Sequence, residues 1–258
     1  MVTGFDIRNT KWISGWKGFP ECWVKIKTPG VTGVIADQVP DPEYEEWVRK
    51  MGQEKVDEIM KQAGYRGTAM HIFIENFIIP LSKSKDPSEA LKNTQTISPK
   101  ILTEEEGVPP NKIDEGRELF YKFYYSDWSN KYMDLIASEL PIYSPTLFYR
   151  GKADVFFNDR VFGPSITDFK TSSGYIKKGS VKELKYKIQL GGYANAVDEM
   201  YKDKGLIVKR SSILCVNTKS ESLQEVVCEG KELEEYKEQF RNLAREYHIK
   251  NNQEYLVA

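Results

Sequence analysis

Two aspartates and a lysine lie close together in the second half of the chain. Asp154 ends the segment Gly151-Lys-Ala-Asp, and Asp168 and Lys170 stand on either side of Phe169. Carboxylate oxygens are the ligands that hard divalent cations such as Mg²⁺ prefer. Such a cation activates water and neutralises charge that develops on a phosphate, and a nearby lysine adds a further positive charge. These residue types are therefore suited to the hydrolysis of a phosphodiester.

The two aspartates lie in segments that predict neighbouring strands. Residues 143–157 and 161–171 are expected to pair as a β-hairpin that turns at Asn158 and Asp159. Pairing of this kind can bring Asp154 close to the second strand. We therefore expect the aspartates to share one site although they are separated in the sequence.

Alternation along the second strand decides which side chains point together. Asp168 and Lys170 are two residues apart and should face the same side, with Phe169 on the opposite, buried side. An Asp-x-Lys triplet alone is weak support, because an exposed salt bridge on a strand uses the same residues. The triplet gains weight because the glycine-led segment that ends at Asp154 precedes it and a patterned helix follows it.

That helix is predicted over residues 181–201. Gln189 and Tyr193 recur at helical spacing after Lys182, so the three side chains share one face. We expect Gln189 and Tyr193 to position the catalytic lysine or a nucleic acid.

Basic residues gather beside these motifs, although the net charge of the whole chain is only -1. A solvated helix face is the ordinary alternative for such a pattern. Next to the two aspartates, we expect the lysines to contact a phosphate backbone. The residues expected to bind nucleic acid are Arg150, Lys152, Lys177, Lys178, Lys182 and Lys185.

A histidine and two glutamates are further candidates. His71 and Glu75 lie one turn apart on a helix predicted over residues 68–81. A lone histidine on a helix is often structural, but this position also suits a metal or phosphate contact. Glu139 precedes the hairpin and could join the acidic cluster as a distant metal ligand. Glu75 and Glu139 could otherwise orient the groups that bind the metal.

Composition restricts the class of protein. With 258 residues, of which 40% are hydrophobic, the chain is long enough for one large domain. No apolar run is long enough for a membrane span. Cys22, Cys215 and Cys228 are too few and too scattered for a disulfide framework or a zinc site. The N-terminus has no pattern of a signal or transit peptide, so we expect a cytoplasmic protein of a bacterial or phage-infected cell.

The remaining pattern divides the chain at residue 140. Residues 1–140 predict an irregular segment with short strands up to residue 40, followed by helices that include His71. Residues 141–258 predict a compact β-β-α-β-β-α unit, and the two parts together form one domain. The expected elements are helices at 41–64, 68–81, 87–93, 113–140, 181–201 and 231–249, strands at 143–157, 161–171, 206–217 and 223–229, and a polar insertion at 82–112. The first helix should bury Tyr44, Trp47, Val48 and Met51.

The order and contexts of the motifs resemble the PD-(D/E)XK nuclease superfamily, and within it the RecB-like exonuclease branch. The mitochondrial genome maintenance exonuclease group is the most similar group that we identify from the motifs. The motifs that carry the resemblance are His71, the Gly151-to-Asp154 segment, Asp168 with Lys170, and Gln189 with Tyr193.

The resemblance implies an α/β fold with a restriction-endonuclease-like core, in which helices flank a mixed central sheet. It implies DNA cleavage with Mg²⁺ or Mn²⁺ held by His71, Asp154, Asp168 and the backbone carbonyl of Phe169. Lys170 would then orient water or stabilise the transition state. The early helices would form an arch over the site, through which single-stranded DNA threads. The iron–sulfur cluster of some relatives is not expected, because the three cysteines are scattered.

These observations favour a metal-dependent exonuclease that acts on single-stranded DNA with a free end, in replication, recombination or repair. Two alternatives remain open. One is a structure-specific or double-strand endonuclease, and the other is a nuclease fold that binds nucleic acid without cutting it. The expected partner is DNA, together with proteins of replication or recombination, and the protein is expected to be a monomer outside any membrane.

Overall fold

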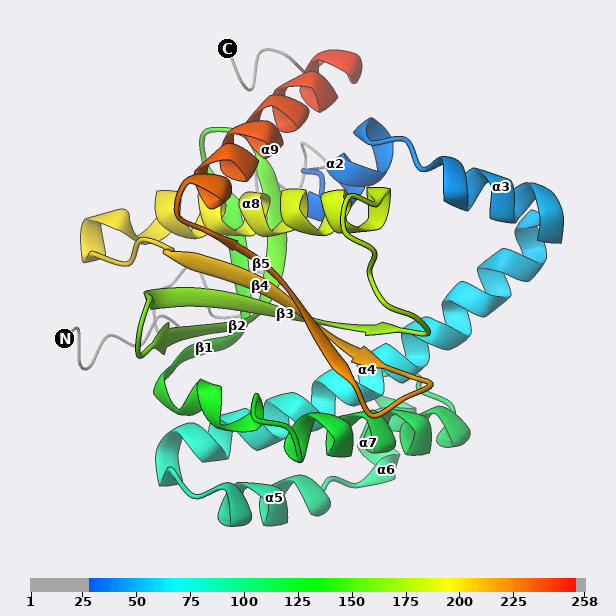
Figure 1. The fold of residues 1–258 in the computed structure, drawn as a ribbon, viewed down its shortest axis with the longest axis vertical. Coiled ribbons are helices and arrows are strands. Elements are labelled where there is room, and N and C mark those ends of the chain that lie inside the picture. Colours follow the sequence, from blue (N-terminus) through cyan, green and yellow to red (C-terminus); the bar gives the residue numbers. More distant parts are fainter. Residues whose placement is uncertain (1–27, 254–258) are drawn as a thin grey trace.

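The computed structural model describes residues 28–253 and contains a central five-stranded sheet (Figure 1). The strands follow the order β1-β2-β3-β4-β5 across the sheet. Only the pair β3–β4 is parallel, and the other neighbours are antiparallel. The strands are β1 (Leu135–Ser144), β2 (Tyr149–Asp159), β3 (Gly163–Ser172), β4 (Arg210–Asn217) and β5 (Leu223–Glu229). The sheet is therefore mixed, as predicted.

Helices cover both faces of this sheet (Figure 1). On one face lie α2 (Val31–Gln38), α8 (Val181–Tyr201) and α9 (Gly230–Lys250). On the other face lie α4 (Gln53–Ser84) and α7 (Pro110–Tyr124), with α5 (Pro87–Gln95) and α6 (Pro99–Glu104) packed beyond them. The helix α3 (Pro42–Met51) joins α2 to α4. Within residues 28–253, no helix has both the length and the apolar character that a membrane span needs.

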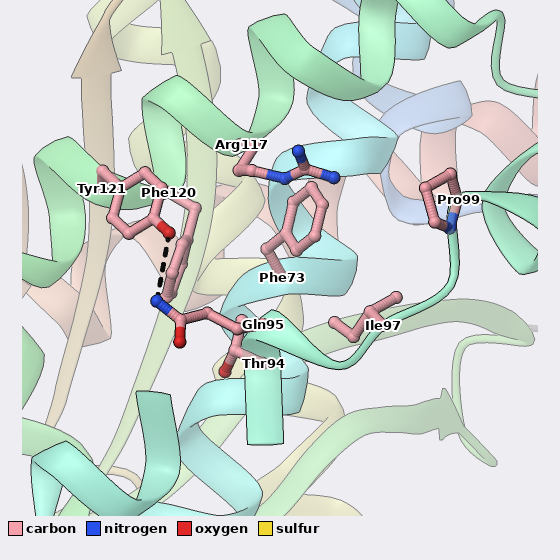
Figure 2. A pocket seen from close by; sticks show the side chains of 8 residues that line it. All are labelled: Phe73, Thr94, Gln95, Ile97, Pro99, Arg117, Phe120 and Tyr121. Atoms are coloured by element: carbon pink, nitrogen blue, oxygen red, sulfur yellow. Dashed lines mark hydrogen bonds between the residues drawn. The ribbon is translucent and has the colours of Figure 1, made fainter. Parts of the chain in front are cut away.

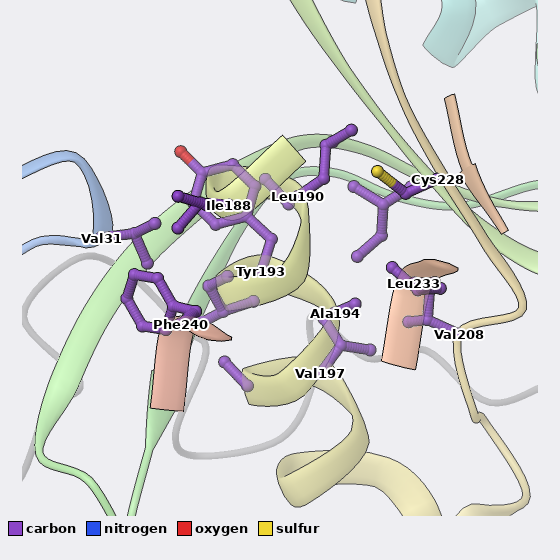
Figure 3. Close-up of a cluster of buried hydrophobic side chains, with 14 of the residues drawn as sticks. Val31, Ile188, Leu190, Tyr193, Ala194, Val197, Val208, Cys228, Leu233 and Phe240 are labelled. Carbon is purple, nitrogen blue, oxygen red and sulfur yellow. The ribbon is translucent and has the colours of Figure 1, made fainter. Parts of the chain in front are cut away.

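Two apolar cores result from this arrangement. The first lies between the sheet and α8 with α9, and Figure 3 shows Tyr193, Leu190 and Phe240 among its side chains. The second lies between the sheet and α4 with α7, and it contains Phe73 and Phe169. Phe169 faces this second core, as alternation along β3 predicted, so its neighbours on the strand face α8.

Close contact between α8 and α9 depends on a glycine. A Cβ atom placed on Gly191 would lie 2.3 Å from the backbone oxygen of Tyr236. The missing side chain thus allows the two helices to approach backbone to backbone, and it holds α8 close to α9.

The N-terminal helical region stands partly away from the body (Figure 1). Within the described residues, none of α3 is buried, and Val56 is the one buried residue of α4 before Ala69. The start of α3 is fastened to α8, because Lys185 Nζ donates to Asp41 Oδ2 at 3.0 Å. The same carboxylate caps α3, since Asp41 Oδ1 accepts the backbone N–H of Tyr44.

Three expectations for the first half were wrong. Residues 31–38 form a helix, where irregular structure with short strands was predicted, whereas residues 1–27 and Cys22 lie outside the described residues. The single helix predicted over residues 41–64 is divided at Gly52 into α3 and α4, and α4 continues through Gly64 into the segment predicted as a second helix. A glycine in a helix costs only about 1 kcal/mol, which the buried second half of α4 readily offsets.

The third error concerns α3. The helix does not bury the expected apolar residues. Tyr44 and Met51 each remain 38% exposed. Helical spacing of apolar residues usually marks a face that packs on a core, and here the helix lies away from both cores.

The segment between residues 82 and 140 also differs from the prediction. The short helix was predicted correctly as α5, but a second short helix, α6, follows it. The helix expected to reach residue 140 ends at Tyr124, and a 3₁₀ helix (Ser129–Asp134) leads into β1. The predicted boundary at residue 140 therefore falls inside a strand. Pro141 lies within β1 and is tolerated there because β1 is an edge strand.

The second half follows the prediction closely. The hairpin of β2 and β3 is present, but it turns at residues 160–162, where Asp159 Oδ1 accepts backbone N–H groups of Val161 and Phe162. The expected long first strand is divided by a turn between β1 and β2. The last two helices and the last two strands lie within a few residues of their expected positions. Cys215 and Cys228 are free and buried, as scattered thiols usually are.

We predict that Gly191→Ala lowers the free energy of unfolding by about 1–3 kcal/mol, because the new methyl group must push α9 away. Gly64→Ala is the matched control, since Gly64 is an exposed helical glycine where an added Cβ would have no atom within 4 Å. It should raise the free energy of unfolding by about 0.5–1 kcal/mol. Urea denaturation measures both. Equal effects of the two substitutions would contradict the packing role of Gly191.

Candidate metal and active site

The carboxylate of Asp154 is buried between β2, β3 and α4. Its residue is only 8% exposed. Oδ2 accepts the backbone N–H of Phe169 at 2.7 Å and lies 3.4 Å from His71 Nδ1. Burial, followed by the negative charge of Asp168, raises the pKa of Asp154 to about 7. A carboxylate held in this environment is stabilised when a cation is placed against it.

His71 is oriented by the same strand. Its Nε2 lies 2.9 Å from the backbone oxygen of Phe169, a distance at which a ring N–H donates to the carbonyl. A neutral ring that donates through Nε2 has a lone pair on Nδ1, and Nδ1 faces Asp154. Histidines that bind metals commonly donate their other ring nitrogen to a carbonyl in this way. The Phe169 carbonyl was expected to bind the metal. Here it accepts a hydrogen bond from His71 and orients that ring.

Glu139 completes a group of three donors. One ligand atom each from His71, Glu139 and Asp154 can be chosen so that all three lie within 4.8 Å of one another. Glu139 lies on β1 opposite Asp154, between the paired positions Ser138–Val155 and Leu140–Ala153. Its φ is 50°, in the left-handed region that side chains other than glycine rarely adopt. Such strain costs about 1–3 kcal/mol and is often found at functional sites.

This donor set fits a divalent cation. One imidazole nitrogen with two carboxylate oxygens suits Mn²⁺, and the carboxylates suit Mg²⁺. Lys152 forms an ion pair with Glu139, so it lies beside the group as predicted. Glu75, one turn after His71, is half-buried. Burial, followed by the charge of Glu139, raises the pKa of Glu75, which places it at the border of the same acidic region.

Asp168 and Lys170 point to the same side of β3 and form an ion pair, as the strand period predicted. Asp168 is 2% exposed, and its Oδ1 accepts from Gln189 Nε2 at 3.1 Å. Burial alone would lower the pKa of Lys170, but the charges of Asp168 and Asp154 outweigh it, and the net shift is upward. Lys170 therefore keeps its positive charge beside the two aspartates.

Tyr193 explains the glycine that leads the Asp154 segment. A Cβ atom on Gly151 would lie 2.9 Å from Cε1 of Tyr193, so only glycine lets this ring approach β2. Burial, followed by the charge of Asp168, raises the pKa of Tyr193 well above its usual value, and the phenol stays neutral. The Gln189 and Tyr193 motif thus holds α8 against both strands that carry the aspartates.

The basic residues expected to bind nucleic acid have different surroundings. Lys177 and Lys178 are exposed on the segment between β3 and α8, and Arg150 is exposed on β2. Lys182 Nζ donates to Ser172 Oγ at 2.9 Å. Lys185 is neutralised by Asp41, so it acts first as a brace of α3.

A separate cavity of about 220 Å³ lies among α4, α7 and the segment between α5 and α6 (Figure 2). Phe73 and Phe120 form much of its wall, and the Arg117 guanidinium lies 5.4 Å from the centre of the Phe73 ring. Gln95 Nε2 donates to Tyr121 Oη across another side. It contains none of the residues of the candidate site.

Comparison with known proteins agrees with the motifs. The family model described as the PD-(D/E)XK nuclease superfamily matches residues 43–255. The chain belongs to this superfamily. No protein with a curated description matches the chain. A crystal structure of a "Putative exonuclease" from Eubacterium rectale is 15% identical, covers 71% of this chain and 68% of that chain, and gives a TM-score of 0.42. A likeness at this level carries no argument of its own.

Membership in the PD-(D/E)XK superfamily confirms the coarser part of the sequence interpretation. The chain has the mixed sheet and flanking helices of this nuclease fold, with a helical region before the sheet. The RecB-like branch and the mitochondrial group remain predictions from the motifs.

Two residues beside this candidate site were not identified from the sequence. Ser172 lies on β3 at the next position of the row formed by Asp168 and Lys170, and the strand period could have identified it. Tyr186 lies on α8 one turn after Lys182. Burial and the neighbouring Cys215 raise the pKa of Tyr186, whereas Lys170 lowers it, so Tyr186 lies near Lys170.

We predict that Glu139→Gln weakens Mn²⁺ binding by about 10-fold or more, because the group of three donors loses one of its two carboxylates. Glu75→Gln is the matched control, since it removes a nearby carboxylate outside the three-donor group. It should bind Mn²⁺ nearly as wild type does. Titration followed by electron paramagnetic resonance measures free Mn²⁺ directly. Equal loss in both variants would mean that Glu139 contributes only general negative charge.

Asp154 also predicts a pH effect on stability without added metal. Its folded-state pKa of about 7 lies above the ordinary value of 3.8. Between these values the native state holds the proton more tightly than the unfolded chain does. This contribution to stability is therefore complete below about pH 4 and is lost as the pH rises to about 7. Urea denaturation in EDTA should show a shallower fall with pH for Asp154→Asn than for wild type. Parallel profiles would contradict the assignment.

Proposed function

We propose that the protein is a metal-dependent DNA exonuclease that prefers single-stranded DNA with a free end. The observation that carries the proposal is the placement of His71, Glu139 and Asp154 as one donor group, with the Lys170 ammonium near enough to act on the charge of Asp154. Superfamily membership supports hydrolysis of a nucleic acid. DNA as substrate, the single strand and the need for an end are our inferences.

The donor group would hold Mg²⁺ or Mn²⁺ between β1, β2 and α4. When bound, such an ion activates water and neutralises charge on the phosphate. His71 is kept in place by the Phe169 carbonyl, and Asp154 by the Phe169 N–H. One residue of β3 therefore orients two of the three ligands through its backbone, which makes their geometry rigid.

Lys170 would bind the scissile phosphate from the next strand. Gln189 holds one oxygen of Asp168, and the other oxygen contacts Lys170. The ammonium is thus kept charged beside the two aspartates, where it would stabilise negative charge in the transition state. Asp168 was expected as a metal ligand, but it lies outside the three-donor group, and its oxygens contact Gln189 and Lys170, so in this proposal it positions the lysine.

The exposed N-terminal helices support the preference for an end. The helix α2 packs into the first core, and the second half of α4 packs into the second core. Between them, α3 and the start of α4 form a continuous span that is fastened to α8 at Asp41. A strand that passes inside this span would have to enter by its end, and a single strand is the thinner substrate. Arg150, Lys152, Lys177 and Lys178 would attract its phosphates.

The proposal is tested with linear and circular single-stranded DNA of one sequence, in Mg²⁺, Mn²⁺ or EDTA. We expect the metal ions to support loss of the linear strand while the circle stays intact. Release of a label from one end before the other gives the polarity. Cutting of the circle would identify an endonuclease, and binding without cutting in any metal would identify a binding subunit.

Lys170→Ala assigns the activity to this site. We expect cleavage to fall by about 10²–10³-fold, because a charge that stabilises the transition state is lost. DNA binding should change little, whereas the free energy of unfolding should fall, because Asp168 loses its buried ion-pair partner. Lys187→Ala, which removes a lysine of α8 paired with Glu232, serves as the control with full cleavage. Wild-type activity of Lys170→Ala would contradict the mechanism.

A further inference from the structure

The polar row on β3 extends beyond the catalytic lysine. Asp168, Lys170 and Ser172 occupy alternate positions of the strand and share the side that faces α8. Gln189 of α8 contacts Asp168 at one end of this row, and Lys182 of α8 contacts Ser172 at the other, with a distance of 2.9 Å. Side chains of β3 and α8 therefore contact each other at both ends of this row, and the contact at Ser172 brings in a second ammonium group, that of Lys182.

The charge of Lys182 differs from that of neighbouring lysines. Lys170, Lys185 and Lys187 each form an ion pair with an aspartate or glutamate. Among residues 28–253, no carboxylate lies within ion-pair distance of Lys182; its Nζ donates to the neutral Ser172 hydroxyl and lies 5.8 Å from the centre of the Tyr186 ring. Ser172 is 9% exposed and fixes the position of the ammonium without neutralising it. Lys182 is therefore held in place with its charge available to an anion.

The spacing along β3 suggests which anion this is. Positions two residues apart on a strand are separated by about 7 Å. The Ser172–Lys182 pair thus lies one such step beyond Lys170, in the direction of the C-terminal end of β3. A single strand of DNA presents one negative phosphate per nucleotide. A strand whose scissile phosphate lies at Lys170 can place a neighbouring phosphate at Lys182.

We propose that Lys182, positioned by Ser172, is a second phosphate subsite that binds the phosphate adjacent to the scissile one. This inference rests on the proposed function. It assigns the two lysines different roles: Lys170 acts on the phosphate that reacts, and Lys182 sets the register of the strand. An oligonucleotide that lacks the second phosphate would be held poorly, so the subsite also limits how short a product can be cut again.

The test removes the charge of Lys182 and the charge of the neighbouring phosphate, first separately and then together. Linear single-stranded oligonucleotides are prepared with one neutral methylphosphonate on either side of a single cleavable linkage. For wild type, the neutral linkage at one of these positions should raise KM by about 10-fold or more, the size expected for a charge-assisted hydrogen bond, while kcat changes little. Lys182→Ala should raise KM for the unmodified strand by a similar factor and reduce the salt slope by about 1.

Combining Lys182→Ala with the neutral linkage tests whether both changes remove the same contact. In Lys182→Ala, the neutral linkage at that position should add no further loss, whereas in the control Lys187→Ala it should cost as much as in wild type. Lys182→Gln separates charge from structure, since an amide can still contact Ser172. It should behave like Lys182→Ala, and Lys182→Arg should restore the wild-type KM.

Additive losses, or a wild-type KM for Lys182→Gln, would overturn the subsite and leave Lys182 as a structural brace of β3. Cleavage of the unmodified strand by wild type establishes the proposed function independently of this result. An absence of that cleavage would overturn the proposed function, and the subsite with it.

Discussion

The burial of the Asp154 carboxylate is the constraint on which the site depends. Removing a carboxylate from water is costly unless hydrogen bonds or opposite charges compensate. Asp154 receives one backbone N–H from Phe169 and faces one histidine nitrogen. These two contacts require β3 to lie beside β2 and α4 to lie across the sheet. The negative charge that they leave uncompensated is what makes the position suitable for a divalent cation.

Residues that pack in the two cores also orient the residues of the site. The Phe169 side chain packs in the second core, while its N–H and carbonyl orient Asp154 and His71. On the opposite face, Tyr193 packs in the first core, and Gly151 gives its ring the space to do so. The ligands are thus held by groups whose positions are already determined by apolar packing. This explains how a chain of nearly neutral charge can concentrate acids and a lysine on the adjacent strands β1, β2 and β3.

The local periods of the sequence predicted much of this arrangement. Alternation in β3 predicted that Asp168 and Lys170 point together and that Phe169 is buried. Helical spacing predicted that Gln189 and Tyr193 share a face, but their positioning role was expected at the lysine or a nucleic acid, whereas Gln189 contacts Asp168. Other features depend on contacts that no local pattern encodes. The left-handed backbone that turns Glu139 into the donor group is an unfavourable conformation, imposed by the surrounding sheet. The pairing of Lys185 with Asp41 joins positions far apart in the chain. Helix α3 has apolar residues at helical spacing, but none of them is buried in a core.

The most direct test of this account is anomalous X-ray scattering from crystals of the protein soaked with Mn²⁺. The account predicts a Mn²⁺ peak bounded by His71 Nδ1 and by carboxylate oxygens of Glu139 and Asp154. The peak should disappear in crystals of Asp154→Asn. Density for Mn²⁺ only at other positions, or no bound Mn²⁺ in a crystal whose site is open to solvent, would contradict the assignment of these residues as a metal site.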